Sequence, residues 1–281
     1  MADFKRSFSD NLIARLQKER LFTNKLMADI HTCNGAVFPA IRNEEISFYY
    51  KGGGLFTYNK DGFKTHIKYG VIPEFDSNYI TEADLNNVTI SMSFYDKYEA
   101  IKERCEKYGS IEAEYVSGLY GSSGLTDSRV ILLDTEIALY DDESKDRIDL
   151  LLYNRESREL CFCEAKHFSN PEIWAKEGNK PEVCDQIRRY NEKIETYAPD
   201  ILIQYTNYIN TFNKLFGTDL PAPTSLHNKT GLLIFGFDSF QREKIKKLLI
   251  DDGSLDGVSY YPTGKLKSDQ ICTLFDKITK A

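Results

Sequence analysis

The chain of 281 residues lacks the excess of positive charge that is typical of proteins that coat nucleic acid. It has 43 acidic residues against 36 Lys and Arg, for a formal net charge of -7. A surface with this balance repels a polyanion on average. A uniformly basic nucleic-acid coat is therefore excluded, and any affinity for nucleic acid must come from local patches and fall steeply with salt.

Long hydrophobic runs are also missing. No stretch approaches the roughly 20 apolar residues that a membrane-spanning helix requires. The first 16 residues are amphipathic and charged, unlike the apolar centre of a signal peptide. We therefore expect a cytoplasmic protein with no membrane partner. The six cysteines include no CxxC pair, so we interpret them as reduced, buried small hydrophobic residues.

Several catalytic signatures are absent from the sequence. The four histidines are scattered without an HExxH pair, which disfavours a zinc protease. The glycine-rich stretches at 52–54 and 121–124 are not followed by GK[ST] and contain no GxSxG, so we interpret both as turns. With 41% hydrophobic and 28% charged residues, the composition is that of an ordinary globular protein with one large domain or two small ones.

Changes in hydrophobic period predict a domain boundary near residue 90. Residues 7–29 repeat apolar side chains at helical spacing and predict an amphipathic helix. Residues 45–69 alternate aromatic and β-branched residues between glycine turns, which predicts a meander of three antiparallel strands. Residues 72–90 lack a clear period and are interpreted as a connection. We assign residues 1–90 to an N-terminal helix and β-meander subdomain.

Residues 91–281 predict a mixed α/β core with a C-terminal extension. Apolar residues at steps of three or four predict one long helix over 94–119, or two helices broken near Gly109. We expect strands at 130–140, 147–154 and 159–168, a helix at 182–197 and a fully covered strand at 231–237. A helix at 241–250, a strand at 258–261 and a helix from 267 follow. The core is assigned to 91–240, and 241–281 to a helical extension packed on it.

Three charged residues fall inside strands that otherwise have the composition of a core. Asp149 interrupts RIDLLLYN, and a buried carboxylate is costly unless something compensates it. In the next strand, alternation places Glu164 and Lys166 on one face. If the two strands pair as a hairpin through residues 155–158, the two carboxylates meet with the ammonium beside them.

Such a cluster suits phosphodiester hydrolysis. Two carboxylates in contact repel each other, and a divalent cation between them removes that repulsion. Magnesium is commonly bound by one or two carboxylates together with a substrate phosphate. A neighbouring lysine can orient or deprotonate the attacking water and offset charge on the transition state. We therefore expect Mg²⁺ or Mn²⁺ as cofactor.

The same residues resemble the motif of the PD-(D/E)xK nuclease superfamily, in particular its RecB-type branch, in which a QxxxY helix follows the ExK strand. The resemblance covers about residues 93–240 and implies an α/β, mixed α+β fold with a restriction-endonuclease-like αβββαβ core. The signal lies in the order of the elements, because ExK alone is expected about once by chance in such a chain. The matching residues are Asp149, then Glu164-Ala165-Lys166, then Gln186 and Tyr190.

What the resemblance implies is a metal-dependent nuclease, with DNA favoured over RNA as its substrate. Asp149, Glu164 and Ala165 then form the metal-binding set, and Lys166 assists the attacking water. Gln186, Tyr190 and Arg189 are expected to position the substrate or the lysine.

The superfamily has a further acidic residue upstream, and this sequence offers several. Glu136 is the first choice for a catalytic role, with Glu112 or Glu114 as substitutes. Asp134 lies on the same predicted strand face as Glu136, so either of the two could be the residue that matters.

Simpler interpretations remain open for each residue. Asp149, Glu164 and Lys166 could form a structural ion pair, and Gln186 and Tyr190, four residues apart, would touch on any helix. Arg188, Arg189 and Lys193 make one side of that helix basic, as a solvated surface or as a contact for DNA phosphates.

An alternative function is a non-catalytic binding or scaffold subunit of a repair or defence complex that keeps the nuclease fold. The acidic balance and the unassigned further acid favour it. The meander at 45–69 is a candidate protein-interaction module, so a protein partner or a homo-oligomer through the N-terminal region is also considered.

Overall fold

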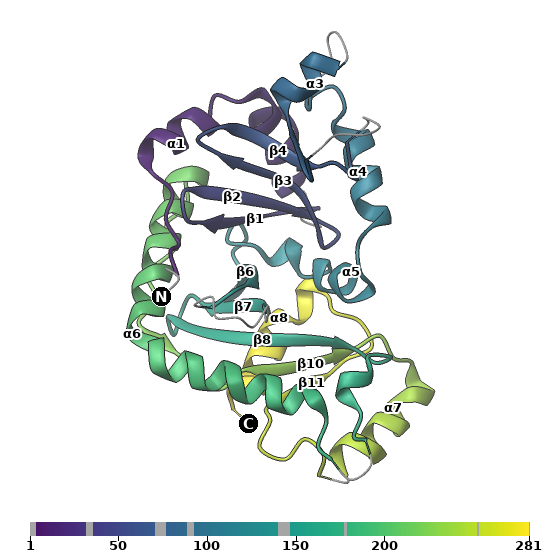
Figure 1. The fold of residues 1–281 in the computed structure, drawn as a ribbon. Coiled ribbons are helices and arrows are strands. Elements are labelled where there is room, and N and C mark those ends of the chain that lie inside the picture. Colours follow the sequence, from purple (N-terminus) through teal and green to yellow (C-terminus); the bar gives the residue numbers. More distant parts are fainter. Residues whose placement is uncertain are drawn as a thin grey trace. The chain divides into compact units, whose positions relative to one another are not determined.

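The computed structural model describes residues 4–31, 36–70, 77–88, 93–139, 147–176, 179–251 and 253–280. These residues form a mixed α/β structure with two sheets and several helices, as expected for the fold class. The chain divides into two compact units (Figure 1). The N-terminal unit comprises 5–125 and 207–220, and the C-terminal unit comprises 1–4, 126–206 and 221–281. These boundaries differ from the predicted division at residue 90.

The N-terminal unit contains a five-stranded antiparallel sheet in the order β1-β2-β3-β4-β5. The predicted meander is confirmed as β2, β3 and β4. The prediction missed both edge strands: β1 contains Pro39, which suits an edge because proline cannot donate to a ladder, and β5 is too short to show a period. The bounds are β1 (Val37–Arg42), β2 (Glu45–Tyr50), β3 (Gly53–Asn59), β4 (Gly62–His66) and β5 (Tyr79–Thr81).

The turn between β2 and β3 requires glycine. Gly52 has φ +79°, and a Cβ added there would lie 2.1 Å from the Cβ of Ala113. Only glycine adopts this conformation without strain and also allows so close an approach. The interpretation of the stretch 52–54 as a turn is therefore confirmed for Gly52, whereas Gly53 and Gly54 begin β3.

The helices of the N-terminal unit follow the predicted periods with one interruption. The predicted helix at 7–29 is broken after Leu16 and resumes through a π-helical turn at Phe22–Leu26. Of the two alternatives for 94–119, the structure shows the second, because separate helices precede and follow Gly109. The bounds are α1 (Asp10–Leu16), α2 (Met27–His31), α3 (Glu82–Val88), α4 (Tyr98–Lys107) and α5 (Ile111–Ser117).

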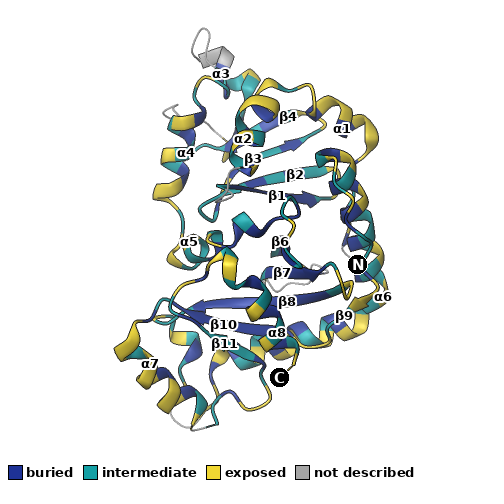
Figure 2. Cartoon of the chain, turned by 180° about the vertical axis from the view of Figure 1, so that it is seen from behind, coloured by how far each residue is buried: buried dark blue, intermediate teal, exposed yellow. Residues whose placement is uncertain are grey.

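The C-terminal unit is built on a sheet in the order β11-β10-β8-β7-β6, with the two-residue β9 beside β8. Strands β6, β7 and β8 form an antiparallel meander, whereas β10 and β11 continue the sheet in parallel. Every residue of β10 is buried, as its apolar sequence predicted (Figure 2). The bounds are β6 (Val130–Ile137), β7 (Ile148–Asn154), β8 (Glu159–His167), β9 (Ser225–Leu226), β10 (Gly231–Phe235) and β11 (Tyr260–Pro262).

The helix after β8 is much longer than predicted. Helix α6 (Glu182–Phe216) passes through Pro199, near which the prediction ended it. A proline inside a helix costs about 3 kcal/mol. Buried side chains at helical spacing continue past it, including Ile201 and Tyr205, and their burial offsets that cost. Residues up to Thr206 belong to the C-terminal unit.

The last segments pack within the C-terminal unit, as expected for 241–281. Helix α7 (Ser239–Ile245) begins with a capping box formed by Asp238 and Gln241. Helix α8 (Ile271–Thr279) buries its apolar face, including Leu274 and Ile278, and contacts β6, β10 and β11. Within the described ranges, no helix has the length and apolarity that crossing a membrane requires.

Candidate active site

The hairpin of β7 and β8 brings Asp149 next to Glu164. Leu150 pairs with Cys163 in the antiparallel register, so the residue before Leu150, which is Asp149, lies opposite Glu164. At this point a side chain replaces the main chain as hydrogen-bond acceptor. The Oδ2 of Asp149 accepts a hydrogen bond of 2.7 Å from the amide of Ala165. The carboxylate is thereby held against the ExK segment.

Lys166 completes the cluster. Its Nζ lies 2.9 Å from Oε1 of Glu164, and the residues are 7% and 1% exposed, so this ion pair is buried. The same Nζ lies 2.7 Å from Oε2 of Glu172. Glu172 was not among the residues predicted from the sequence. It lies on the short 3₁₀ turn Pro171–Ile173, which the Asn170 side chain caps, and no motif spacing marks it.

The register of β6 on β7 separates the roles of Asp134 and Glu136. After a β-bulge between Leu132 and Asp134, Asp134 lies opposite Leu151 and not opposite Asp149. Asp134 is fully buried and accepts a hydrogen bond of 3.0 Å from the hydroxyl of Tyr205 on α6. Its position is thus explained by packing.

Glu136 is the acidic residue of β6 that lies near Asp149. The pairs Thr135–Leu150 and Ile137–Ile148 place it opposite Asp149. It adopts φ +53°, a conformation that a glutamate rarely takes within a strand. Backbone strain of this kind clusters at functional sites. Glu112 and Glu114 lie in the first turn of α5, in the N-terminal unit.

The pKa values of Asp149 and Lys166 are both raised in this cluster. Burial, followed by the neighbouring Glu164 and Glu136 carboxylates, raises the pKa of Asp149 well above its ordinary value, although the Ala165 amide and Lys166 oppose this. Burial alone would lower the pKa of Lys166, but the carboxylates of Glu164, Glu172 and Asp149 outweigh it and raise the pKa. Lys166 is therefore an ammonium at neutral pH, and Asp149 carries an electrostatic cost when ionised.

Gln186 and Tyr190 contact each other, as their spacing on α6 predicted. The Gln186 amide donates to the Tyr190 hydroxyl over 2.8 Å. That hydroxyl donates to the carbonyl of Arg147 over 2.9 Å, directly before β7 begins. Tyr190 is 2% exposed, so its hydroxyl fixes α6 to the strand that carries Asp149, two residues further on.

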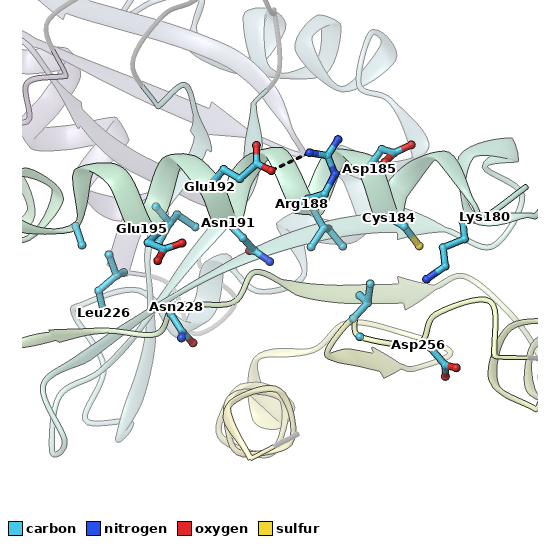
Figure 3. Close-up of a pocket in the computed structure, with 15 residues that line it drawn as sticks. Lys180, Cys184, Asp185, Arg188, Asn191, Glu192, Glu195, Leu226, Asn228 and Asp256 are labelled. Atoms are coloured by element: carbon cyan, nitrogen blue, oxygen red, sulfur yellow. Dashed lines mark hydrogen bonds and ion pairs between the residues drawn. The ribbon is translucent and has the colours of Figure 1, made fainter.

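Two residues of the predicted basic side of α6, Arg188 and Arg189, line different pockets. Arg188 lines a groove of about 650 Å³, where it pairs with Glu192 at 2.8 Å and Asp185 at 3.6 Å (Figure 3). Arg189 lines a smaller pocket of about 300 Å³ together with Gln186 and Glu172, the partner of Lys166. Arg189 is therefore the basic residue of this helix beside the candidate site.

The donor chemistry of the site fits a hard divalent cation. Asp149 and Glu164 provide carboxylate oxygens, Ala165 provides a main-chain carbonyl, and Mg²⁺ is bound by oxygen ligands of these kinds. Each carboxylate has lone pairs beyond those used by its present hydrogen bond or ion pair. No group of three or more His, Cys, Asp or Glu side chains within the described residues is close enough to form a metal site by itself.

Comparisons with protein-family models, with curated proteins and with solved structures found no match for this chain. Function is therefore inferred from the residues of the site. Within the C-terminal unit, the residues nominated from the sequence around Asp149 lie on β6, β7, β8 and α6, and Glu172 joins them from the turn after β8.

The structural role of Asp134 gives a testable prediction. Tyr205→Phe removes a hydrogen-bond donor from a buried carboxylate, so it is expected to lower the free energy of unfolding by about 1–3 kcal/mol. Urea unfolding followed by circular dichroism measures this loss. A change below about 0.5 kcal/mol, the level of an ordinary surface substitution, would mean that the hydroxyl does not stabilise Asp134.

Proposed function

We propose that the protein is a metal-dependent nuclease that hydrolyses phosphodiester bonds, with DNA favoured over RNA. One observation carries the proposal: at the end of a hairpin rich in buried apolar residues, Glu164 and Lys166 form a buried ion pair, and the Asp149 carboxylate accepts a hydrogen bond from the amide of Ala165, the residue between them. A fold retains so costly a group of charges more readily when it serves a site than when it serves packing alone.

The proposed roles follow from the contacts. Asp149, Glu164 and the carbonyl of Ala165 would hold Mg²⁺ or Mn²⁺, which when bound supplies positive charge for the phosphate and a more acidic water. Lys166 is held by two carboxylates that favour its ammonium form. We therefore assign it to orienting the attacking water and offsetting negative charge in the transition state, rather than to taking a proton.

The residues around this centre have supporting roles in the proposal. Glu136 is the further acid, because its charge acts on Asp149. Tyr190 positions β7 through Arg147, and Gln186 positions Tyr190. Arg189 would contact a phosphate from the adjoining pocket.

The topology of the C-terminal unit supports a restriction-endonuclease-like core. Its antiparallel meander β6-β7-β8 is followed by α6 and then by β10, which is parallel to β8. This is the βββαβ part of the αβββαβ core that the resemblance to the PD-(D/E)xK superfamily implies; the helices that precede β6 in the sequence, α4 and α5, belong to the N-terminal unit.

The direct test is cleavage of end-labelled single- and double-stranded DNA with Mg²⁺ or Mn²⁺, followed on denaturing gels. Wild type is expected to cleave, and EDTA and Glu164→Gln are expected to abolish cleavage. Glu192→Gln is the matched control, because Glu192 pairs with Arg188 in the other groove of the same helix. Equal cleavage by wild type and Glu164→Gln would rule out this site as the origin of the activity.

A second candidate function is the non-catalytic binding or scaffold subunit. The closed set of ion pairs among Lys166, Glu164 and Glu172 favours it, because such a set can act as structure alone. A scaffold function predicts that calorimetry shows no binding of Mn²⁺ to the wild-type protein. Uptake that Glu164→Gln abolishes would exclude it in favour of the nuclease.

A further inference from the structure

A row of four aromatic rings reaches the surface of the N-terminal unit. His66 of β4 lies opposite Tyr79 of β5, with ring centroids 5.3 Å apart. The ring of Tyr69 lies 5.8 Å from that of His66, and Tyr108, directly after α4, lies 6.0 Å from Tyr69. We call these four residues the aromatic row.

Both ends of the aromatic row carry a lysine against a ring. The Nζ of Lys64 lies 5.6 Å from the ring centroid of Tyr79, and the Nζ of Lys68 lies 5.6 Å from that of Tyr108. Lys64 also pairs with Glu45 at 3.1 Å, whereas Lys68 is exposed. Burial, followed by the positive charge of Lys68, lowers the pKa of His66, so its ring is neutral at pH 7.

The two outer rings are not used to fill the core. Tyr79 is 51% exposed and Tyr108 is 57% exposed. On β4 the core is filled instead by the alternate residues Phe63 and Thr65, which are buried. Exposed large aromatic residues brought together at one place commonly mark a binding surface.

We propose that the aromatic row binds single-stranded nucleic acid, with bases stacked on Tyr79 and Tyr108 and phosphates contacting Lys64 and Lys68. Aromatic rings beside lysines are the usual means of binding single strands without sequence preference, because every base has a π face and every nucleotide a phosphate. Duplex DNA offers no open base faces, so the surface selects unpaired strands. The aromatic row thus supplies local affinity in a chain of net charge -7.

This inference rests on the proposed nuclease function in one respect only, that the bound strand is its substrate. Binding itself requires neither metal nor cleavage. It can therefore be measured in EDTA, and its failure is distinguishable from a failure of catalysis.

The experiment is fluorescence anisotropy of the full chain with labelled dT20, U20 and a DNA hairpin duplex, in EDTA and at several salt concentrations. Wild type is expected to bind the single strands more tightly than the duplex. Tyr79→Ala and Tyr108→Ala are each expected to weaken binding about 5- to 100-fold, the usual effect of losing one stacking ring. Replacing Lys64 and Lys68 together with glutamine is expected to reduce the salt slope by about 1.4, for two lost phosphate contacts.

Matched variants separate stacking from folding. Tyr79→Phe and Tyr108→Phe keep the rings and are expected to bind as wild type does, as is Phe240→Ala, which removes an 89% exposed ring from α7 in the other unit. Equal affinity of wild type and the Tyr→Ala variants for dT20 would overturn the proposal. Self-association on size-exclusion chromatography that Tyr108→Ala abolishes, without any binding of dT20, would instead assign the aromatic row to a protein contact.

Discussion

Asp149→Asn is expected to abolish cleavage while making the metal-free protein more stable. The substitution removes a charge that burial, Glu164 and Glu136 all disfavour, and asparagine can still accept the hydrogen bond from the Ala165 amide. We expect cleavage to fall at least about 10³-fold, because catalytic charges commonly have effects of this order. The free energy of unfolding in EDTA at pH 7.5 should rise by about 1–3 kcal/mol, because the neutral amide avoids the cost of ionising a carboxyl group whose pKa is raised by burial and by two neighbouring carboxylates.

The stability gained by Asp149→Asn should depend on pH with a defined sign. The pKa of Asp149 is raised in the folded state, so between the ordinary aspartate pKa and the raised value the folded protein binds more protons than the unfolded chain. Stability of wild type therefore falls as pH rises through this range. The advantage of Asp149→Asn should be absent near pH 4 and grow as pH rises.

Urea unfolding of both proteins from pH 4 to pH 8 measures this difference. Mn²⁺ should raise the melting temperature of wild type at pH 7.5 but not that of Asp149→Asn, because a bound cation stabilises only the protein that binds it. If Asp149→Asn is less stable than wild type at pH 7.5 in EDTA, Asp149 is a structural residue and its role as metal ligand loses its support.

Lys166→Met is expected to lower the free energy of unfolding, whereas Asp149→Asn is expected to raise it. It keeps the apolar stem but removes the ammonium that is paired with the buried Glu164 carboxylate. Breaking a buried pair from one side costs about 3–5 kcal/mol, so a loss of this size is expected in urea unfolding. Cleavage should fall about 10²- to 10⁴-fold, the range for a group acting directly on the reacting atoms.

The double variant Glu164→Gln with Lys166→Met provides the control. It removes both charges, so it should recover most of the stability that Lys166→Met loses, without recovering any cleavage. The double-mutant cycle then isolates the energy of this pair. Equal stability of Lys166→Met and wild type would show that the ammonium does not compensate Glu164.

The sequence predicted the centre of the candidate site because local patterns determine it. The apolar stretches RIDLLLYN and ELCFCEAKHF, with a polar turn between them, are sufficient to predict the hairpin that brings Asp149 to Glu164. The contact between Gln186 and Tyr190 follows from helix geometry in the same way.

The other features of the site and of the fold depend on contacts that no short sequence pattern encodes. Alternation by itself places Asp134 and Glu136 on one face, and only the register of β6 on β7 shows that Glu136, not Asp134, lies opposite Asp149. Glu172 reaches Lys166 through an irregular turn. Helix α6 continues past Pro199 because packing outweighs local propensity.

A crystal soaked in Mn²⁺ tests the central claim most directly, by anomalous scattering from the metal. One anomalous peak is expected within about 2.0–2.6 Å of carboxylate oxygens from both Asp149 and Glu164, the distance of oxygen ligands to such cations. Absence of a peak there at saturating Mn²⁺, with Glu164 still paired to Lys166, would contradict the assignment of this cluster as a metal-dependent nuclease site.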